Sequence, residues 1–351
     1  MITMKELLLM AKEKNASDVH ITVGIPPKCR VNGELMDMGV PSLLPQDTDT
    51  LVKSLMNERQ LEYLEKEGEV DFSYSINQIG RYRVNVFKQR GSYAAAIRLV
   101  GTEIPSPESL GLTKSIVDLT NKKRGLVLVT GPTGSGKSTS LASLINVMNN
   151  QDNVHIITLE DPIEYLHKHK KAIVNQREIG LDSRSFSNAL RAALRQDPDV
   201  ILVGEMRDLD TISIAVTAAE TGHLVFSTLH TIGAASTIDR IIDAFPPHQQ
   251  QQIRIQLSSV LECIISQQLI PTMDGKGRVA AFEIMHVNSA IRNLIREGKT
   301  HQIQSIIQTN KKIGMQTMDD SIFELYTRGI IDSERATMYA VDASTMSRKV
   351  Y

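Results

Sequence analysis

In this 351-residue sequence cysteines are scarce and long apolar runs are absent. Its two cysteines, Cys29 and Cys263, lie far apart and form no CxxC pair, so neither a disulfide framework nor a cysteine-rich zinc site is expected. No apolar run approaches the roughly 18 residues that suggest a membrane-spanning helix. The N-terminus also lacks the basic, apolar and small-residue regions of a signal peptide. We therefore expect a cytoplasmic protein without direct membrane insertion.

An excess of charge of one sign is lacking as well. The 39 basic and 40 acidic side chains give a formal charge of −1, which offers no bulk electrostatic reason to expect nucleic-acid binding. An aromatic base-stacking pattern is also absent. Apolar residues make up 41% of the chain and charged residues 23%, which is typical of a soluble globular protein. The length exceeds the size at which one core usually stops growing and so predicts two domains.

Residues 1–100 are predicted to form a small α+β domain with a mostly antiparallel sheet. Apolar spacing favours helices over residues 4–14 and 46–65. Alternation and turn signals, such as Asn32-Gly33, predict strands within residues 18–23, 28–35, 70–76, 82–87 and 93–99. Residues 101–111 contain two prolines and two glycines but few apolar residues, and are the predicted linker to a second domain at 112–351.

The second domain is predicted to be α/β, because short apolar strands alternate with helices as in a parallel sheet covered on both faces. The predicted strands are residues 126–129, 155–159, 200–203 and 224–227. The predicted helices are residues 138–148, 186–195, 211–220 and 234–244. Beyond residue 246 we expect a mainly helical region, broken by one strand-like stretch at 279–285.

Residues 131–138 match the phosphate-binding pattern G-x-x-x-x-G-K-S between a predicted strand and a predicted helix. Gly131, Gly134 and Gly136 allow successive backbone N–H groups to point at phosphate oxygens, aided by the positive end of the helix. The alternative is a glycine-rich turn that only starts a helix. Because every fixed position of the pattern is filled in the required context, nucleotide binding is favoured.

The expected cofactors are ATP and Mg²⁺. Lys137 would reach the β- and γ-phosphates, and the hydroxyl of Ser138 would ligate Mg²⁺. The expected nucleotide-binding residues all lie in the loop and the start of the helix: Gly131, Thr133, Gly134, Ser135, Gly136, Lys137, Ser138 and Thr139.

Two acidic segments follow predicted strands, where open α/β sheets place their ligand sites. Residues 159–165 carry three carboxylates, among them Glu160, that either polarise an attacking water and hold Mg²⁺ through water or form a solvated turn. Residues 201–205 end at Glu205 in a Walker B arrangement, although Gly204 stands where many P-loop enzymes carry the metal-binding Asp. We therefore expect Glu205 to organise Mg²⁺ or to share this role with Glu160.

Histidines stand at either end of a predicted strand within residues 221–231. His230 is a candidate sensor of the γ-phosphate. The alternative is a packed hydrogen-bonding residue, which is the commoner role of a histidine at a strand end.

Taken in order, these motifs closely resemble those of the secretion ATPase superfamily and, within it, the type IV pilus retraction ATPases of the PilT family. Two further stretches carry the resemblance, residues 190–199 and 290–297. The second resembles the motif that distinguishes retraction motors from pilus-assembly ATPases. In it, Ile291, Leu294 and Ile295 have the spacing of a buried stripe. Arg292 and Arg296, one turn apart on another face, are either hydrated or contact a partner.

The resemblance implies a homohexamer in which an N-terminal domain similar to a PAS fold packs against the RecA-like domain of the next subunit. Arginines supplied in trans stabilise the charge on a departing γ-phosphate. Arg81 and Arg83 are candidates, since residues two apart on a strand point to the same face. A solvated strand face is the alternative. The family also implies an inner-membrane pilus platform protein as partner, and therefore peripheral membrane association.

The function implied is an Mg²⁺-dependent ATPase motor, converting ATP to ADP and phosphate, that powers pilus retraction and twitching motility. Three alternatives stay open. The first is a pilus-assembly or type II secretion ATPase. The second is a RecA-like nucleic-acid translocase, which balanced charge disfavours. The third is a nucleotide-gated scaffold with little turnover.

Overall fold

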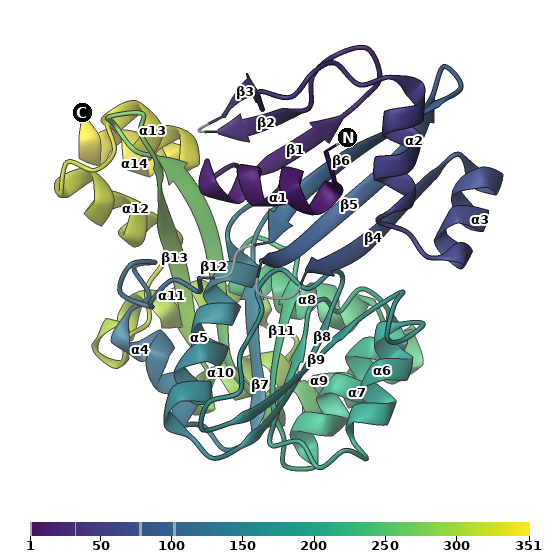
Figure 1. The fold of residues 1–351 in the computed structure, drawn as a ribbon. Helices are drawn as coiled ribbons and strands as arrows, with labels where there is room; N and C mark the ends of the chain where they lie inside the picture. The colour runs from purple at the N-terminus through teal and green to yellow at the C-terminus, as the bar shows by residue number, and fades with distance from the viewer. Residues whose placement is uncertain (1, 32, 77–78, 101–102) are drawn as a thin grey trace. The chain divides into compact units, whose positions relative to one another are not determined.

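The computed structural model describes residues 2–31, 33–76, 79–100 and 103–351 (Figure 1). The chain divides into two compact units, and each is described by itself. The first comprises Met1–Glu103 with Glu164–Leu166, and the second comprises Ile104–Ile163 with His167–Tyr351. Asn32 of the predicted hairpin turn, and residues 101–102 of the predicted linker, lie outside the described residues.

The first unit is built on a six-stranded sheet of order β3-β2-β1-β6-β5-β4, and every neighbouring pair is antiparallel. Its strands are β1 (Asp18–Ile21), β2 (Lys28–Val31), β3 (Glu34–Asp37), β4 (Glu69–Ile76), β5 (Gly80–Gln89) and β6 (Ser92–Val100). Helices α1 (Met4–Glu13), α2 (Pro45–Lys53) and α3 (Glu58–Glu67) contribute to its core. The predicted helical region 46–65 is therefore two helices, the second capped by the side chain of Asn57.

The second unit contains a seven-stranded sheet of order β13-β12-β7-β11-β10-β8-β9. Six strands are parallel and β13 pairs antiparallel with β12. The strands are β7 (Gly125–Thr130), β8 (His155–Glu160), β9 (Ile173–Glu178), β10 (Val200–Val203), β11 (Leu224–Leu229), β12 (Leu261–Pro271) and β13 (Arg278–His286). The predicted parallel α/β sheet is thus confirmed.

Helices cover both faces of this sheet, as Figure 1 shows for α5 on one side and α7 and α9 on the other. Side chains alternate along β7, with Leu126 and Leu128 in one core and Val127 and Val129 in the other. The first of these cores contains residues of α6 (Phe186–Ala193), α7 (Leu209–Glu220), α8 (Ala234–Asp243), α9 (Pro247–Val260), α10 (Ser289–Glu297) and α11 (Ile303–Thr309). The second contains α4 (Lys114–Val117) and α5 (Lys137–Gln151).

The chain from α9 onward is less helical than predicted. The stretch expected at 279–285 is part of β13, but the 11-residue strand β12 precedes it and was missed. No glycine or proline separates α9 from β12, because Val260 ends the helix and Leu261 begins the strand. The last part is helical, with α12 (Met318–Thr327), α13 (Ser333–Tyr339) and α14 (Ala343–Val350) around a separate small core.

Three short 3₁₀ turns complete the second unit: Asp118–Asn121, Thr300–Gln302 and Lys311–Ile313. Within the described residues, no helix combines the length and the apolar character that crossing a bilayer requires.

Candidate nucleotide-binding and catalytic site

The predicted phosphate-binding loop joins the end of β7 to the start of α5, and β12 packs closely against it. Gly131 has φ 140°, and a Cβ there would lie 2.2 Å from the carbonyl oxygen of Gln267. Gly136 has φ 88°, and its Cβ would lie 2.9 Å from Nε2 of Gln267. The backbone conformation therefore favours glycine at both positions, and the close approach of the β12 backbone also requires it at Gly131.

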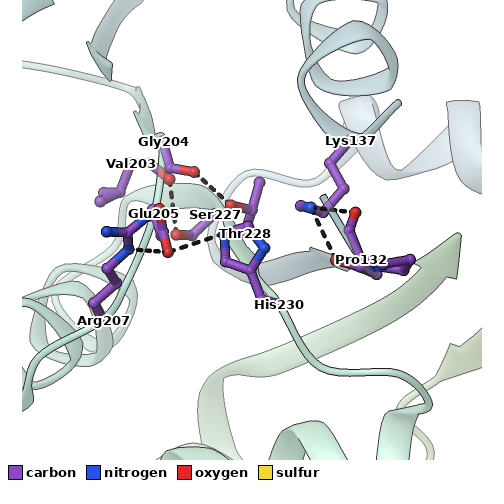
Figure 2. A network of polar contacts seen from close by, with 10 residues as sticks. Pro132, Lys137, Val203, Gly204, Glu205, Arg207, Ser227, Thr228 and His230 are labelled. Atoms are coloured by element: carbon purple, nitrogen blue, oxygen red, sulfur yellow. Dashed lines mark hydrogen bonds and ion pairs between the residues drawn. The ribbon is translucent and has the colours of Figure 1, made fainter. Parts of the chain in front are cut away.

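Lys137 begins α5 and is buried. Its Nζ donates to the carbonyl oxygens of Gly131 at 2.9 Å and Pro132 at 3.0 Å, as Figure 2 shows. The ammonium group is thus held over the loop by neutral acceptors. Phosphate oxygens are stronger partners for an ammonium group than carbonyl oxygens, because they carry a negative charge that attracts the positive charge of the lysine.

The remaining loop residues fit an anionic ligand. The hydroxyl oxygen of Ser135 is buried and has no hydrogen-bond partner among the described residues. Ser138 and Thr139 are half-buried in the first turn of α5, while Thr133 and Gly134 are exposed. Because first-turn N–H groups have no intrahelical partner, this helix start is suited to bind phosphate.

The pairing register brings the other predicted motifs to the same edge of the sheet. Thr130 of β7 pairs with Leu229 of β11, and Val203 of β10 pairs with both Ser227 of β11 and Leu159 of β8. Residues after these positions therefore emerge together at the carboxyl edge, where open α/β sheets bind ligands. His230 follows β11, Glu205 follows β10, and Glu160 ends β8. These three strands come one after another beyond β7 in the sheet, and neighbouring strands lie about 4.8 Å apart.

Glu205 forms a compact polar cluster with Arg207 and His230 (Figure 2). Nε of Arg207 donates to Oε1 of Glu205, and Nε2 of His230 lies 3.1 Å from the same oxygen. The hydrogen bond and the negative charge of Glu205 raise the pKa of Arg207. The cluster opens on a cavity of about 390 Å³ that Arg240 also lines.

Glu160 is the last residue of β8 and is half-buried. Its Oε1 accepts from the hydroxyl of Thr158 at 2.6 Å and from Nε2 of Gln176 at 3.0 Å. The Glu160 carboxylate is thus held by neighbouring side chains, whereas Asp161 and Glu164 of the same segment are exposed.

Packing explains the glycine in the Walker B position. A Cβ on Gly204 would lie 3.0 Å from the carbonyl oxygen of Leu159 and 3.4 Å from Cα of Glu160. The N–H of Gly204 also donates to that carbonyl at 2.7 Å. An aspartate would not fit without moving β8, so Glu205 is the first acid after β10.

The two predicted histidines lie at opposite ends of β11. His223 precedes the strand, and its Nδ1 is 2.9 Å from the carbonyl oxygen of Ala218. His223 is therefore a packed residue away from the carboxyl edge, whereas His230 lies at that edge beside Glu205.

The arginine candidates lie on β5 of the first unit. The buried side chains of Tyr82, Val84 and Val86 alternate with Arg81 and Arg83 along the strand. Arg81 is half-buried and Arg83 is exposed, so both occupy the face opposite these three residues, as the spacing predicted. Their catalytic role stays a prediction.

The stretch 290–297 forms most of α10. Ile291 and Ile295 are fully buried and Leu294 is partly buried, which confirms the apolar stripe. The two arginines differ, however. Arg296 is exposed, while Arg292 donates through Nη1 to the carbonyl oxygens of Ser258 at 2.6 Å and Ser259 at 2.7 Å. The interpretation of both as one hydrated face is wrong for Arg292, because it binds the end of α9.

The parallel sheet, the glycine loop with its lysine and the acids at the carboxyl edge define an α/β protein of the P-loop type. The family described as type II/IV secretion system protein matches residues 2–337. The chain belongs to this family and, within it, to the pilus retraction ATPases of the PilT type.

Relatives cover nearly the whole chain. The type IV pilus retraction ATPase PilT of Pseudomonas aeruginosa is 48% identical over 94% of this chain and 96% of its own length. A twitching motility protein of Neisseria gonorrhoeae is 48% identical over 92% of this chain and 86% of its own. A crystal structure of the pilus retraction motor PilT with bound ADP has a TM-score of 0.93, with 51% identity over 99% of this chain and all of that one.

Proposed function

We propose that this protein is an ATP-hydrolysing motor that powers type IV pilus retraction. The observation that carries the proposal is the phosphate-binding loop, where Lys137 is held over the loop next to a carboxyl edge that bears Glu205, His230 and Glu160. The similarity to retraction ATPases over nearly the full length supports the biological role.

In the proposed mechanism, N–H groups of the loop and of the first turn of α5 bind the phosphates of ATP. Lys137 exchanges the carbonyls of Gly131 and Pro132 for β- and γ-phosphate oxygens. Bound Mg²⁺ would supply positive charge that offsets the negative charge of the phosphates. Ser138 would be a direct ligand, and Glu205 would hold water molecules of the metal's shell.

The remaining residues act on the reacting centre. Glu160 orients the attacking water and accepts its proton. The water oxygen bonds to the γ-phosphorus while the bond from that phosphorus to the bridging oxygen breaks, which leaves ADP and phosphate. His230, placed beside Glu205, would act as the sensor of the γ-phosphate. Arg81 and Arg83 of a neighbouring subunit stabilise the charge that grows on the equatorial oxygens.

This arrangement needs a neighbouring subunit, and the family resemblance favours a homohexameric ring. The first unit, which we propose to be PAS-like, would supply its arginines to the next subunit and rotate with each hydrolysis cycle. The ring would lie on the cytoplasmic side, peripherally associated with the inner membrane. From there it would pull on a pilus platform protein in that membrane.

Lys137→Ala tests the catalytic part. It should abolish ATP hydrolysis in a folded protein, because the variant loses the charge that binds the β- and γ-phosphates. Lys123→Ala is the matched control, since Lys123 is an exposed lysine of the same unit just before β7. Near-normal turnover by the folded Lys137→Ala protein would exclude this loop as the active site.

Imaging of pili after deletion of the gene tests the biological role. Extension should continue while retraction stops. Loss of pili would instead indicate a pilus-assembly ATPase, and loss of protein secretion a type II secretion ATPase. ATPase activity stimulated by DNA, with strong salt dependence, would indicate a nucleic-acid translocase. Absence of measurable turnover would indicate a nucleotide-gated scaffold.

A further inference from the structure

Strand β9 forms one edge of the second unit's sheet, and its side chains support the segment that contains Glu160. Gln176 and Glu178 are two residues apart, so their side chains lie on the same face of the strand. Both make hydrogen bonds to residues 160–167, the segment that leaves β8 at its carboxyl end.

The side-chain amide of Gln176 joins the two ends of this segment. Its Nε2 donates to Oε1 of Glu160 at 3.0 Å, and its Oε1 accepts from the backbone N–H of His167 at 2.8 Å. Glu178, buried, accepts between these points from the backbone N–H of Ile163 at 3.0 Å. The segment is therefore fixed at its start, middle and end by one strand.

The register explains why a glutamine suits this position. Gln176 pairs with Thr158, and both side chains donate to the same oxygen of Glu160. An amide supplies a donor for the carboxylate and an acceptor for the N–H of His167 at once, which neither a carboxylate nor an aliphatic side chain can do. Burial, assisted by the charge of Lys170, lowers the pKa of His167 to about 4, so its ring is neutral near pH 7 and adds no charge here.

We propose that Gln176 is a positioning residue for hydrolysis, which holds the Glu160 carboxylate in the orientation that the attacking water requires. This inference rests on the proposed function, in which Glu160 acts on that water. In this role the amide acts through the Glu160 carboxylate. Displacement of a reacting group by about 1 Å can reduce a rate by about 100-fold, so loss of this support should be measurable.

A purely structural role for Gln176 predicts a different outcome. If the amide only stabilised the edge of the sheet, its removal would lower thermal stability and leave the turnover of the remaining folded protein unchanged. Kinetic constants of the folded protein therefore separate positioning from stability, provided that kcat and KM are measured independently.

The test compares Gln176→Glu, Gln176→Leu and the control Asn175→Asp in the full-length protein. Gln176→Glu keeps the acceptor for His167 but loses the donor to Glu160. Gln176→Leu loses both without adding charge. Asn175→Asp makes the same amide-to-carboxylate change one residue earlier on the strand, where the exposed Asn175 contacts the ring of His155 at 2.9 Å.

Steady-state ATP hydrolysis, corrected for the folded fraction, should show kcat reduced between about tenfold and 100-fold for both Gln176 variants, with KM for ATP unchanged. Asn175→Asp should match the wild type.

The inference would be overturned by wild-type kcat in either folded Gln176 variant, or by an equal loss in Asn175→Asp. If Glu160→Gln is inactive while Gln176→Glu is not, this inference alone fails. Wild-type turnover of Glu160→Gln would overturn both this inference and the proposed role of Glu160.

Discussion

Arg292 of α10 lies beside Glu262 of β12, with Nη2 3.2 Å from Oε1, although 30 residues separate them in the sequence. The same guanidinium donates to the carbonyl oxygens of Ser258 and Ser259. These groups stand at the end of α9, where carbonyls lack intrahelical partners and a cation is favourable. Glu262 also pairs with Lys122 just before β7, at 2.9 Å. A residue of the stretch 290–297 thus joins α10, the α9–β12 junction and the approach to the P-loop strand.

We predict that Arg292→Ala destabilises the protein, whereas Arg296→Ala does not. Loss of the guanidinium leaves two carbonyls and Glu262 without this donor, which should reduce the free energy of unfolding by about 1–2 kcal/mol, allowing for the partial exposure of the side chain. Chemical denaturation of both variants measures the difference. Arg296→Ala should stay within about 0.5 kcal/mol of the wild type, because Arg296 is exposed on the helix surface. Equal midpoints and slopes for the two variants would contradict the structural role of Arg292.

This difference also changes how the stretch is tested in cells. Lost retraction in an Arg292 variant could arise from the altered α9–β12 junction alone. Arg296→Ala, by contrast, removes an exposed charge and is the sharper test of a coupling surface. At matched expression, lost retraction with retained ATPase activity in Arg296→Ala would assign coupling to this side chain.

A second prediction concerns the glycine at the Walker B position. Gly204→Ala should weaken the contact between β8 and β10, because its Cβ would lie 3.0 Å from the carbonyl oxygen of Leu159. Such crowding typically costs about 1–3 kcal/mol. ATPase activity should fall as well, since Glu160 and Glu205 both adjoin this contact. The measurements are the melting temperature and the ATPase turnover of Gly204→Ala. If both match the wild type, β8 can move aside without cost and the prediction is wrong.

The third prediction separates the two acids. Glu160→Gln and Glu205→Gln should each permit ATP binding but slow hydrolysis, since loss of a general base costs about 10²- to 10⁴-fold. The double variant should be little slower than the worse single variant, because both residues act on one assembly. Single-turnover hydrolysis with separately measured nucleotide affinity provides the test. Unchanged turnover in Glu160→Gln would leave the catalytic role with Glu205.

Residues that follow a strong local pattern could be predicted from the sequence. The loop at 131–138 and the strand ends before Glu160, Glu205 and His230 depend on short apolar runs and glycines, which are local signals. Neighbouring parallel strands then bring these ends together without further information.

The supporting contacts could not be predicted, because they come from strands with weak or ambiguous patterns. Strand β9 has only two apolar residues, Ile173 and Val174, so neither it nor the role of Gln176 was found. Strand β12 follows α9 without a turn, and a short apolar run alone does not distinguish a strand from a helix. Gln267, which packs under the phosphate-binding loop, was missed for this reason.

The last prediction tests whether Arg81 and Arg83 serve a neighbouring subunit. The double variant Arg81→Ala with Arg83→Ala should assemble into rings but hydrolyse ATP poorly, because the growing charge on the γ-phosphate loses its stabilising partners. Lys137→Ala subunits are inactive for a different reason. Mixed rings would contain interfaces that combine an intact loop from one variant with intact arginines from the other.

The mixture should therefore hydrolyse ATP faster than either protein alone. Fluorescence energy transfer between labelled subunits would verify that exchange takes place. If exchange occurs and activity stays at the level of the separate proteins, the arginines do not act across the interface. Full activity of the double variant alone would place both on an ordinary solvated strand face.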